Sequence, residues 1–203
     1  MIATKKNTSQ AFYRHPVWRT FALLVLCIGA VLRFVVWWQQ RSIFLDEANL
    51  IRNWVEKSYL DMWGHLAYEQ YAPPLYSMLN KVVLAGFGNS ELSMRLVPLL
   101  FGLGSLYLFY KIGRQFLSPF ALFLASIFMA WGHLFIQYST ECKQYSSDGF
   151  VALALIYVAV QHQHSIFTWK KAALWLLFGS LSIWFSMPSV FVLAGVGFLF
   201  FFK

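Results

Sequence analysis

The sequence predicts an all-α membrane protein: a polytopic bundle of about six transmembrane helices, with amphipathic interfacial helices in its first outer loop. Of the 203 residues, 59% are hydrophobic and only 12% are charged, whereas ordinary soluble domains are about 45–50% apolar and about 25% charged. The mean hydropathy is +0.57, and the apolar residues gather in several long stretches. Such stretches suit membrane spans, because a bilayer core requires about 20 apolar residues per helix.

The first apolar run, residues 17–38, is long enough to cross a bilayer, because about 22 residues at about 1.5 Å each span about 33 Å. A cleaved signal peptide would have an apolar core of about 7–15 residues and a small-residue cleavage site, and this run has neither feature. Arg33 lies one turn before its end and can extend toward the interface, where Trp37 and Trp38 are typical of an aromatic belt. The later spans are expected at 94–110, 119–138, 149–161, 172–186 and 189–202.

Positive charges gather on one side of this six-span arrangement. That side holds both termini, no acidic residue and nine cations: Lys5, Lys6, Arg14, Arg19, Lys111, Arg114, Lys170, Lys171 and Lys203. Because Lys and Arg accumulate in cytoplasmic connections, we expect both termini to be cytoplasmic and residues 39–92 to form the first extracytoplasmic loop. We therefore expect a multi-pass protein of the cell membrane, whose net charge of +8 comes from basic connections and not from nucleic-acid binding.

The outer loop begins with two adjacent carboxylates, Asp46 and Glu47, which are the first acidic residues of the chain. Apolar residues recur at helical spacing over 46–59, which predicts an amphipathic helix lying at the interface. The proline pair at 73–74 favours a second helix, from 75 to about 87. Asp46 is expected at the N-terminus of the first helix. There a carboxylate can cap free backbone amides or act as a general base, and the spacing leaves both interpretations open.

The outer side combines carboxylates, a few cations and many aromatic residues. The chain has no glycine-rich phosphate loop, paired-cysteine motif or nucleophile elbow. A carboxylate beside cations suits transfer of a group from a phosphate, because the carboxylate accepts the proton of the attacking hydroxyl and a cation neutralises the departing phosphate. Since this side faces outward, a lipid-phosphate donor fits better than ATP or a nucleotide-activated sugar.

Four segments resemble the C-type glycosyltransferase superfamily, and most closely its protein-mannosyltransferase-like and aminoarabinose-transferase-like members. They are Leu-Asp-Glu-Ala at 45–48, Ala-Pro-Pro-Leu-Tyr at 72–76, residues 88–96 at the entry to the second span, and residues 138–146 at the outer end of the third. The resemblance implies an inverting transfer of a sugar from a polyprenyl-phosphate donor to a lipid, glycan or protein acceptor, with Asp46 as the general base.

We place Glu47 beside Asp46 in the catalytic pair, and assign it a supporting role there, because it could instead support the start of the helix. Substrate contacts are expected from six further residues: Lys143, Arg95, Tyr71, Tyr76, Tyr145 and Glu141. Structural explanations stay open for these as well. Lys143 could pair with Glu141 or anchor the chain at the interface, Arg95 could anchor a span, and the tyrosines suit a membrane belt.

The sequence does not decide whether a divalent metal takes part. Ala72 stands before the proline pair, where relatives often have His or an acid, so a metal site of that kind cannot be carried over. His65 and Glu69, four positions apart, would share a helix face and could together bind a metal, or they could form an ordinary exposed pair.

The chain ends inside an apolar run, whereas superfamily members are much longer. We therefore treat residues 1–203 as one glycosyltransferase-like domain that is an N-terminal portion, and we expect its activity alone to be incomplete. The alternative to an enzyme is an inactive relative, or a non-enzymatic scaffold or transport subunit of the membrane.

Overall fold

The structure is a computed structural model that describes residues 12–163 and 168–201. These residues form an all-helical protein. The longer helices are α2 (Val17–Trp38), α6 (Leu96–Phe116), α7 (Pro119–Trp131), α9 (Tyr145–His162), α10 (Trp169–Phe185) and α11 (Ser189–Phe201). The shorter elements are α3 (Leu45–Glu56), η1 (Asp61–Trp63), α4 (Pro74–Phe87), α5 (Glu91–Met94) and α8 (His133–Tyr138).

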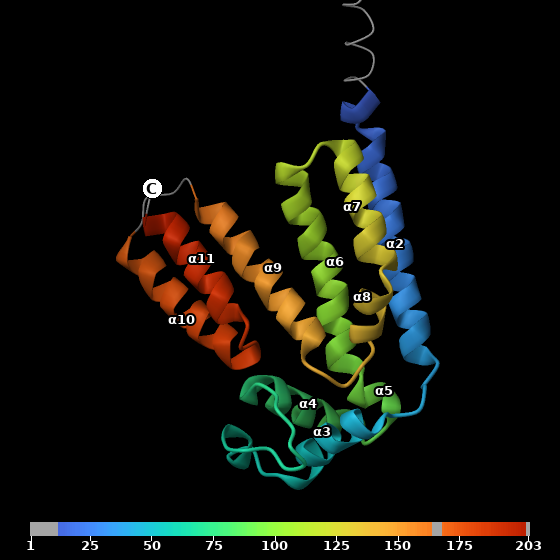
Figure 1. Cartoon of the computed structure of the whole chain (residues 1–203), viewed down its shortest axis with the longest axis vertical. Helices are drawn as coiled ribbons and strands as arrows, with labels where there is room; N and C mark the ends of the chain where they lie inside the picture. The colour runs from blue at the N-terminus through green and yellow to red at the C-terminus, as the bar shows by residue number, and fades with distance from the viewer. Residues whose placement is uncertain (1–11, 164–167, 202–203) are drawn as a thin grey trace, which may run out of the picture.

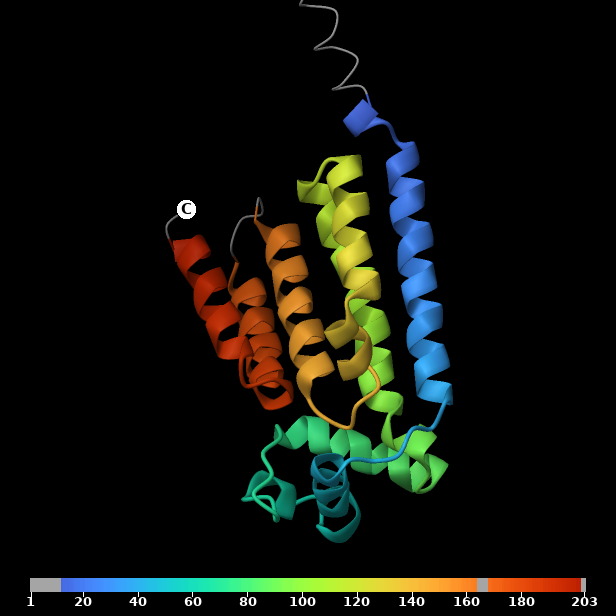
Figure 2. The same cartoon turned by 45° about the vertical axis from the view of Figure 1, so that its right-hand side comes forward.

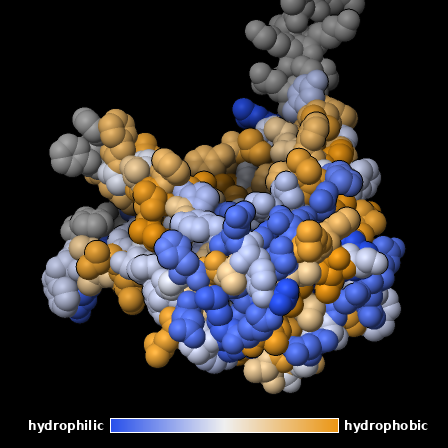
Figure 3. Space-filling model, turned by 60° about the horizontal axis from the view of Figure 1, so that its bottom comes forward, coloured by the Kyte–Doolittle hydropathy of each residue, from blue (hydrophilic) through white to orange (hydrophobic). Residues whose placement is uncertain are grey.

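The longer helices run side by side and alternate in direction, so that α2 begins and α11 ends at the same end of the bundle (Figure 1). The elements α3, η1, α4 and α5 lie across the opposite end in both views (Figures 1 and 2), and we call them the loop layer. Hydrophilic residues cover most of the centre of the face seen from that end, with hydrophobic residues among them and at the rim (Figure 3). The loop layer is thus the polar end of a mainly apolar bundle.

Within the part of the chain that the structure describes, two helices are long and apolar enough to cross a membrane, α2 and α6. The helices α7 and α11 are shorter but also apolar. Large hydrophobic side chains of α2 face outward, among them Val31 and Trp38, which are each 60% exposed. Contiguous apolar surface of this kind is rare on soluble proteins and suits contact with lipid. The chain is therefore all-helical with helices fit for a membrane, while the full set of about six spans remains a prediction.

The bounds of α2 agree with the predicted run 17–38, but the run predicted at 119–138 is interrupted. Helix α7 ends at Trp131, Gly132 leaves helical geometry with φ −58° and ψ 120°, and α8 follows. Glycine favours such a break because it has the lowest helix propensity after proline. The interruption leaves the carbonyl groups of Met129 and Ala130 available, and both accept hydrogen bonds from Arg33.

Other boundaries also differ from the prediction. The segment expected as 94–110 divides at Arg95 (φ −101°, ψ 5°) into α5 and the longer α6. The helix expected at 149–161 already begins at Tyr145. Helix α4 begins at Pro74 and ends before Gly88, whose φ of +81° is natural for glycine.

The amphipathic helix predicted at 46–59 is α3, which ends at Glu56. Its apolar stripe does not lie on lipid, because Leu50, Ile51 and Trp54 are buried in one protein core. Tyr76 of α4 belongs to the same core, with its ring 6.1 Å from that of Trp54. Packing between α3 and α4 therefore replaces the expected contact with the interface and gives the loop layer a core of its own.

Candidate active site

Glu47 is the centre of a buried polar contact in the first turn of α3. Its Oε2 accepts a hydrogen bond from the backbone N–H of Phe44 at 3.1 Å, which supports the start of the helix. Its Oε1 accepts from the backbone N–H of Cys142 at 2.8 Å. Its Oε2 also lies 3.1 Å from the guanidinium of Arg95 in a salt bridge. One carboxylate thus joins α3, the loop after α8 and the junction of α5 with α6.

The surroundings of Glu47 keep it ionised. Burial alone would raise its pKa and is the largest single influence. Hydrogen bonds from the Cys142 amide, the Arg95 guanidinium and the Phe44 amide outweigh burial, so the pKa of Glu47 lies below its ordinary value. Because both oxygens are engaged and the side chain is only 1% exposed, Glu47 supports the helix start and offers no free oxygen to a substrate.

Arg95 is an internal residue and not the expected substrate contact or interfacial anchor. It is 1% exposed. Besides Glu47, its guanidinium donates to the carbonyl oxygens of Arg41 and Ser42. From the break between α5 and α6, this side chain thus reaches residues 41 and 42, in the segment that leads into α3. Its charge therefore stabilises the loop layer from within.

Asp46 points away from this buried pair. Its side chain is 74% exposed, and its Oδ2 lies 3.2 Å from Nζ of Lys143. Its Oδ1 accepts from the side-chain amide of Gln70 at 3.4 Å. The Lys143 ammonium and the Gln70 amide hold the pKa of Asp46 below its ordinary value. Helix capping by Asp46, one of the two interpretations left open, is not seen, because the side chain that bonds a backbone amide at the start of α3 is that of Glu47.

Lys143 is the partner that fixes the Asp46 carboxylate. It is only 8% exposed, and its Nζ also donates to Oε1 of Gln70 at 2.8 Å. An ammonium has three N–H donors, so one remains for a ligand. The expected alternative, a pair with Glu141, is wrong: Lys143 pairs with Asp46, and Glu141 accepts from the side-chain amide of Gln137 at 3.2 Å.

The three tyrosines expected to contact a sugar have different surroundings. Tyr76 is fully buried, and its hydroxyl donates to the carbonyl oxygen of Lys143 at 2.7 Å. Burial raises its pKa, and the expectation that it stacks on a substrate is wrong. Tyr71 and Tyr145 are 67% and 45% exposed, respectively, so their rings are available. Tyr145 packs against Tyr138 with 4.6 Å between ring centroids.

A pocket of about 270 Å³ lies between residues 62–74 of the outer loop and the end of α10 with the turn that follows it. Gln70 lines this pocket and also bonds Asp46. Tyr71, Trp63 and Trp184 supply aromatic walls, and the two tryptophan rings meet edge-to-face at 4.8 Å. We call it the aromatic pocket. Aromatic walls with a few polar groups are typical of sites for small organic ligands, sugars included.

A second cavity of about 340 Å³ lies between α2, α6, α8 and α9, and Arg33 lines it. Arg33 is 1% exposed and donates to the carbonyl oxygens of Gly29, Ala130 and Met129 and to Oγ of Ser139, at 2.9–3.1 Å. The expectation that it extends to the interface is wrong, because the interruption of α7 gives it internal partners. No carboxylate pairs with it among the described residues. Sequence reasoning did not assign Arg33 to the site, although a charge inside an apolar run is the usual signal for one.

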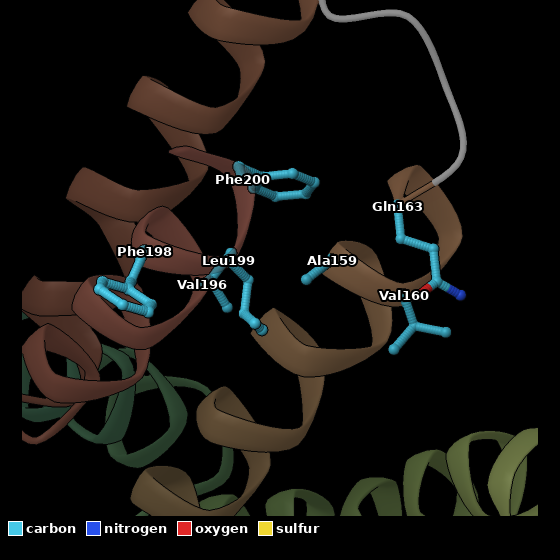
Figure 4. Close-up of a pocket in the computed structure, with 7 residues that line it drawn as sticks. All are labelled: Ala159, Val160, Gln163, Val196, Phe198, Leu199 and Phe200. Atoms are coloured by element: carbon cyan, nitrogen blue, oxygen red, sulfur yellow. The ribbon is translucent and has the colours of Figure 1, made fainter. Parts of the chain in front are cut away.

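A third pocket, of about 370 Å³, lies between α9 and α11 (Figure 4). No charged side chain is among the residues that line it. Its walls are apolar except for one glutamine: Ala159, Val160, Gln163, Val196, Phe198, Leu199 and Phe200. It lies toward the end of the bundle away from the loop layer, because these residues end α9 and α11 (Figure 1).

The helical pair through which His65 and Glu69 could have bound a metal together is not formed. Residues 64–73 are not helical, and Glu69 itself has a left-handed φ of 53°, so His65 and Glu69 do not share a helix face. Within 12–163 and 168–201, no three or more His, Cys, Asp or Glu side chains are grouped to hold a metal ion.

Comparisons with protein-family models, curated proteins and solved structures found no match. The geometry of the site therefore carries the functional argument.

Proposed function

We propose that α2, α6, α7 with α8, α9, α10 and α11 are six membrane spans, with both termini cytoplasmic and the loop layer extracytoplasmic. The alternating direction of these helices supports this arrangement (Figure 1). The charge distribution supports it as well. Lys111, Arg114 and Lys170 lie at helix ends away from the loop layer, whereas the acidic residues lie between 46 and 91 or between 141 and 148. Such a bias toward Lys and Arg favours a cytoplasmic position.

We propose further that the protein is a membrane glycosyltransferase that transfers a sugar from a polyprenyl-phosphate donor to a lipid, glycan or protein acceptor. One observation carries this proposal: the exposed carboxylate of Asp46 is paired with the nearly buried Lys143 and shares Gln70 with the aromatic pocket. A carboxylate that is ionised at a solvent-accessible rim has the free electron pair that a general base requires. The adjoining pocket has the aromatic walls that sugar rings favour.

In the proposed reaction, Asp46 accepts the proton of the acceptor hydroxyl while the hydroxyl oxygen attacks the anomeric carbon. The bond from that carbon to the phosphate oxygen breaks, and the lipid phosphate leaves with the electron pair, so the configuration inverts. Lys143 orients Asp46 and offers its remaining N–H. Arg33 is the second cation that this proposal offers to the phosphate, because its cavity is also lined by Tyr145, one of the expected substrate contacts.

Transfer from polyprenyl-phosphate-linked sugars tests this proposal. The full-length protein is reconstituted in vesicles and supplied with a panel of radiolabelled lipid-linked sugars and, separately, nucleotide sugars. We expect transfer from a lipid-linked sugar only, and a marked loss in Trp184→Ala, which opens the aromatic pocket. Lack of transfer from every donor, with helical content intact, would favour the non-enzymatic alternative.

A further inference from the structure

A polar pocket lies between α6 and α9 at the end of the bundle away from the loop layer. Its volume is about 210 Å³, and its walls are Lys111, Arg114, Gln115, Tyr157 and Gln161. Since a water molecule takes about 30 Å³ of liquid volume, the space exceeds what a few ordered waters fill. The pocket holds two cations, a phenol and two side-chain amides. None of these residues belongs to the proposed catalytic site, so the pocket needs its own explanation.

The two cations of this pocket are not neutralised by protein groups. In the described part of the chain, neither Lys111 nor Arg114 forms a salt bridge. Each cation instead lies over an aromatic ring: Nζ of Lys111 lies 5.6 Å from the ring centroid of Tyr107, and Cζ of Arg114 lies 5.5 Å from that of Tyr110. Contact with a ring face attracts a cation but leaves its N–H groups unused. The pocket therefore offers several charge-assisted donors to an anion.

No acidic side chain in this region competes for those donors. The eight acidic residues of the chain all lie between positions 46 and 148. The pocket residues come from the last turns of α6 and α9, and α9 continues for more than two turns after the last acid. Arg and Lys beside a phenol and amides are the groups that bind phosphate oxygens.

The exposed face of α6 indicates where the anion comes from. Leu100, Tyr107 and Arg114 are spaced by seven residues and therefore lie on one stripe of the helix. All three are exposed, with Leu100 at 57% and Tyr107 at 60%. An apolar track that ends at a cation fits a phospholipid, with an acyl chain along the helix and the phosphate at its end. A free phosphate would not need the track.

We propose that this pocket binds the headgroup phosphate of an anionic phospholipid in the cytoplasmic leaflet. Lys111 and Arg114 contact the phosphate oxygens, Tyr157, Gln115 and Gln161 hydrogen-bond the headgroup, and an acyl chain follows the stripe of α6. Basic pockets between membrane helices on the cytoplasmic side bind anionic headgroups in this way. This inference requires the membrane orientation proposed above but not the glycosyltransferase activity.

Lipid binding to the purified full chain tests the inference. The protein in detergent is titrated with phosphatidylglycerol or phosphatidylcholine, and bound lipid is counted by native mass spectrometry. We expect a preference for phosphatidylglycerol, reduced roughly 30-fold in the double variant Lys111→Gln/Arg114→Gln, since each basic residue near a membrane surface contributes about 1 kcal/mol. The matched control, Arg14→Gln/Lys170→Gln, removes one Arg and one Lys from exposed positions at the same end and should keep the preference.

Each outcome decides between explanations. Equal losses of lipid binding in both double variants would overturn the assignment to this pocket, because the overall positive charge at that end of the bundle would then explain binding. Displacement of the lipid by millimolar inorganic phosphate would overturn the lipid assignment in favour of a free-phosphate site. Arg114→Lys keeps the charge but loses the planar guanidinium that can bind a phosphate through two N–H groups, so we expect an intermediate loss of lipid binding. Unchanged binding in Lys111→Gln/Arg114→Gln would end the proposal.

Discussion

Glu47 and Arg95, which are 48 positions apart, form a salt bridge of 3.1 Å with side chains only 1% and 2% exposed. The pair joins the first turn of α3 to the break between α5 and α6. Successive residues of a helix point about 100° apart, so Asp46 is turned outward when Glu47 is turned inward. The buried pair therefore sets the direction of the exposed carboxylate on which the proposed chemistry depends.

Glu47→Gln should destabilise the protein strongly. The change leaves the buried guanidinium of Arg95 without its counter-charge, and removal of one partner of a buried pair typically costs about 3–5 kcal/mol. Thermal unfolding of the detergent-solubilised protein, followed by far-UV circular dichroism, measures the loss.

The exposed pair of Arg52 and Glu56 is the matched control, because it is also a Glu–Arg pair and its glutamate lies in the same helix, α3. Nε of Arg52 lies 3.2 Å from Oε1 of Glu56, but the two side chains are 55% and 52% exposed. Such an exposed pair on one helix contributes only about 0.3–0.5 kcal/mol to stability. Glu56→Gln should thus have little effect. Equal losses from Glu47→Gln and Glu56→Gln would contradict the structural role of the buried pair.

The same pair should make the loop layer sensitive to acid. The pKa of Glu47 is lower in the folded protein than its ordinary value. Its contribution to stability is therefore complete above the ordinary glutamate pKa of about 4.3 and is lost as the pH falls through the lower folded-state pKa. Melting temperatures measured between pH 7 and pH 3 should fall more steeply for the natural protein than for Glu47→Gln. Parallel curves would show that Glu47 does not titrate in this way.

Local patterns were enough to predict several elements. The apolar run 17–38 and the proline pair before α4 identify helices directly, because length, hydropathy and proline geometry act within a few residues. The stripe of α3 also predicts its helical form, although the partner of that stripe is α4 and not lipid. These features depend only on neighbours in the chain.

The contacts of the candidate site depend on residues distant in sequence. Asp46 meets Lys143, and Arg33 meets the carbonyl groups freed by Gly132, across about 100 positions. A single sequence contains no periodicity that pairs such residues. Lys143 therefore looked able to pair with its neighbour Glu141, and the internal position of Arg33 was missed.

Gly29→Ala should weaken the packing of α2 against α7. A Cβ at Gly29 would lie 2.7 Å from Cβ and 2.8 Å from Cα of Ala130, and a backbone atom cannot move aside cheaply. Close approach through small residues is typical of helix pairs in membranes, and overpacking costs about 1–3 kcal/mol. Gly149→Ala is the control, because its Cβ would meet nothing within 4 Å, and it should leave the melting temperature unchanged or raise it slightly. A neutral Gly29→Ala would contradict the close contact.

Single cysteines should report the orientation of the bundle. In a Cys27→Ser background, a cysteine at Ser58 in the loop layer should react with a membrane-impermeant maleimide in intact cells. A cysteine at Ser118, before α7, should react only after permeabilisation. Cys142 is buried, and burial raises the pKa of its thiol, so it should contribute little background. Labelling at 118 but not at 58 in intact cells would reverse the proposed orientation.

Asp46→Asn should abolish most of the proposed transferase activity while leaving the protein folded. Asparagine keeps the size and most of the hydrogen bonding of Asp46 but cannot accept the proton of the acceptor hydroxyl. General-base catalysis typically contributes about 10²–10⁴-fold, so the loss should appear in turnover and not in the apparent affinity for the donor. The folded state should change little, because Asp46 is exposed and the start of α3 is held by Glu47.

The pH dependence of turnover separates this role from a merely structural one. Lys143 is the main cause of the low pKa of Asp46, so the natural protein should keep its base ionised below the ordinary aspartate pKa of about 3.9. Lys143→Gln removes that cause, and the acidic limb of the turnover profile should then move to higher pH. If Asp46→Asn retains near-normal turnover at a normal level of folded protein, Asp46 is not the base. An acidic limb unmoved by Lys143→Gln would likewise assign it to another group.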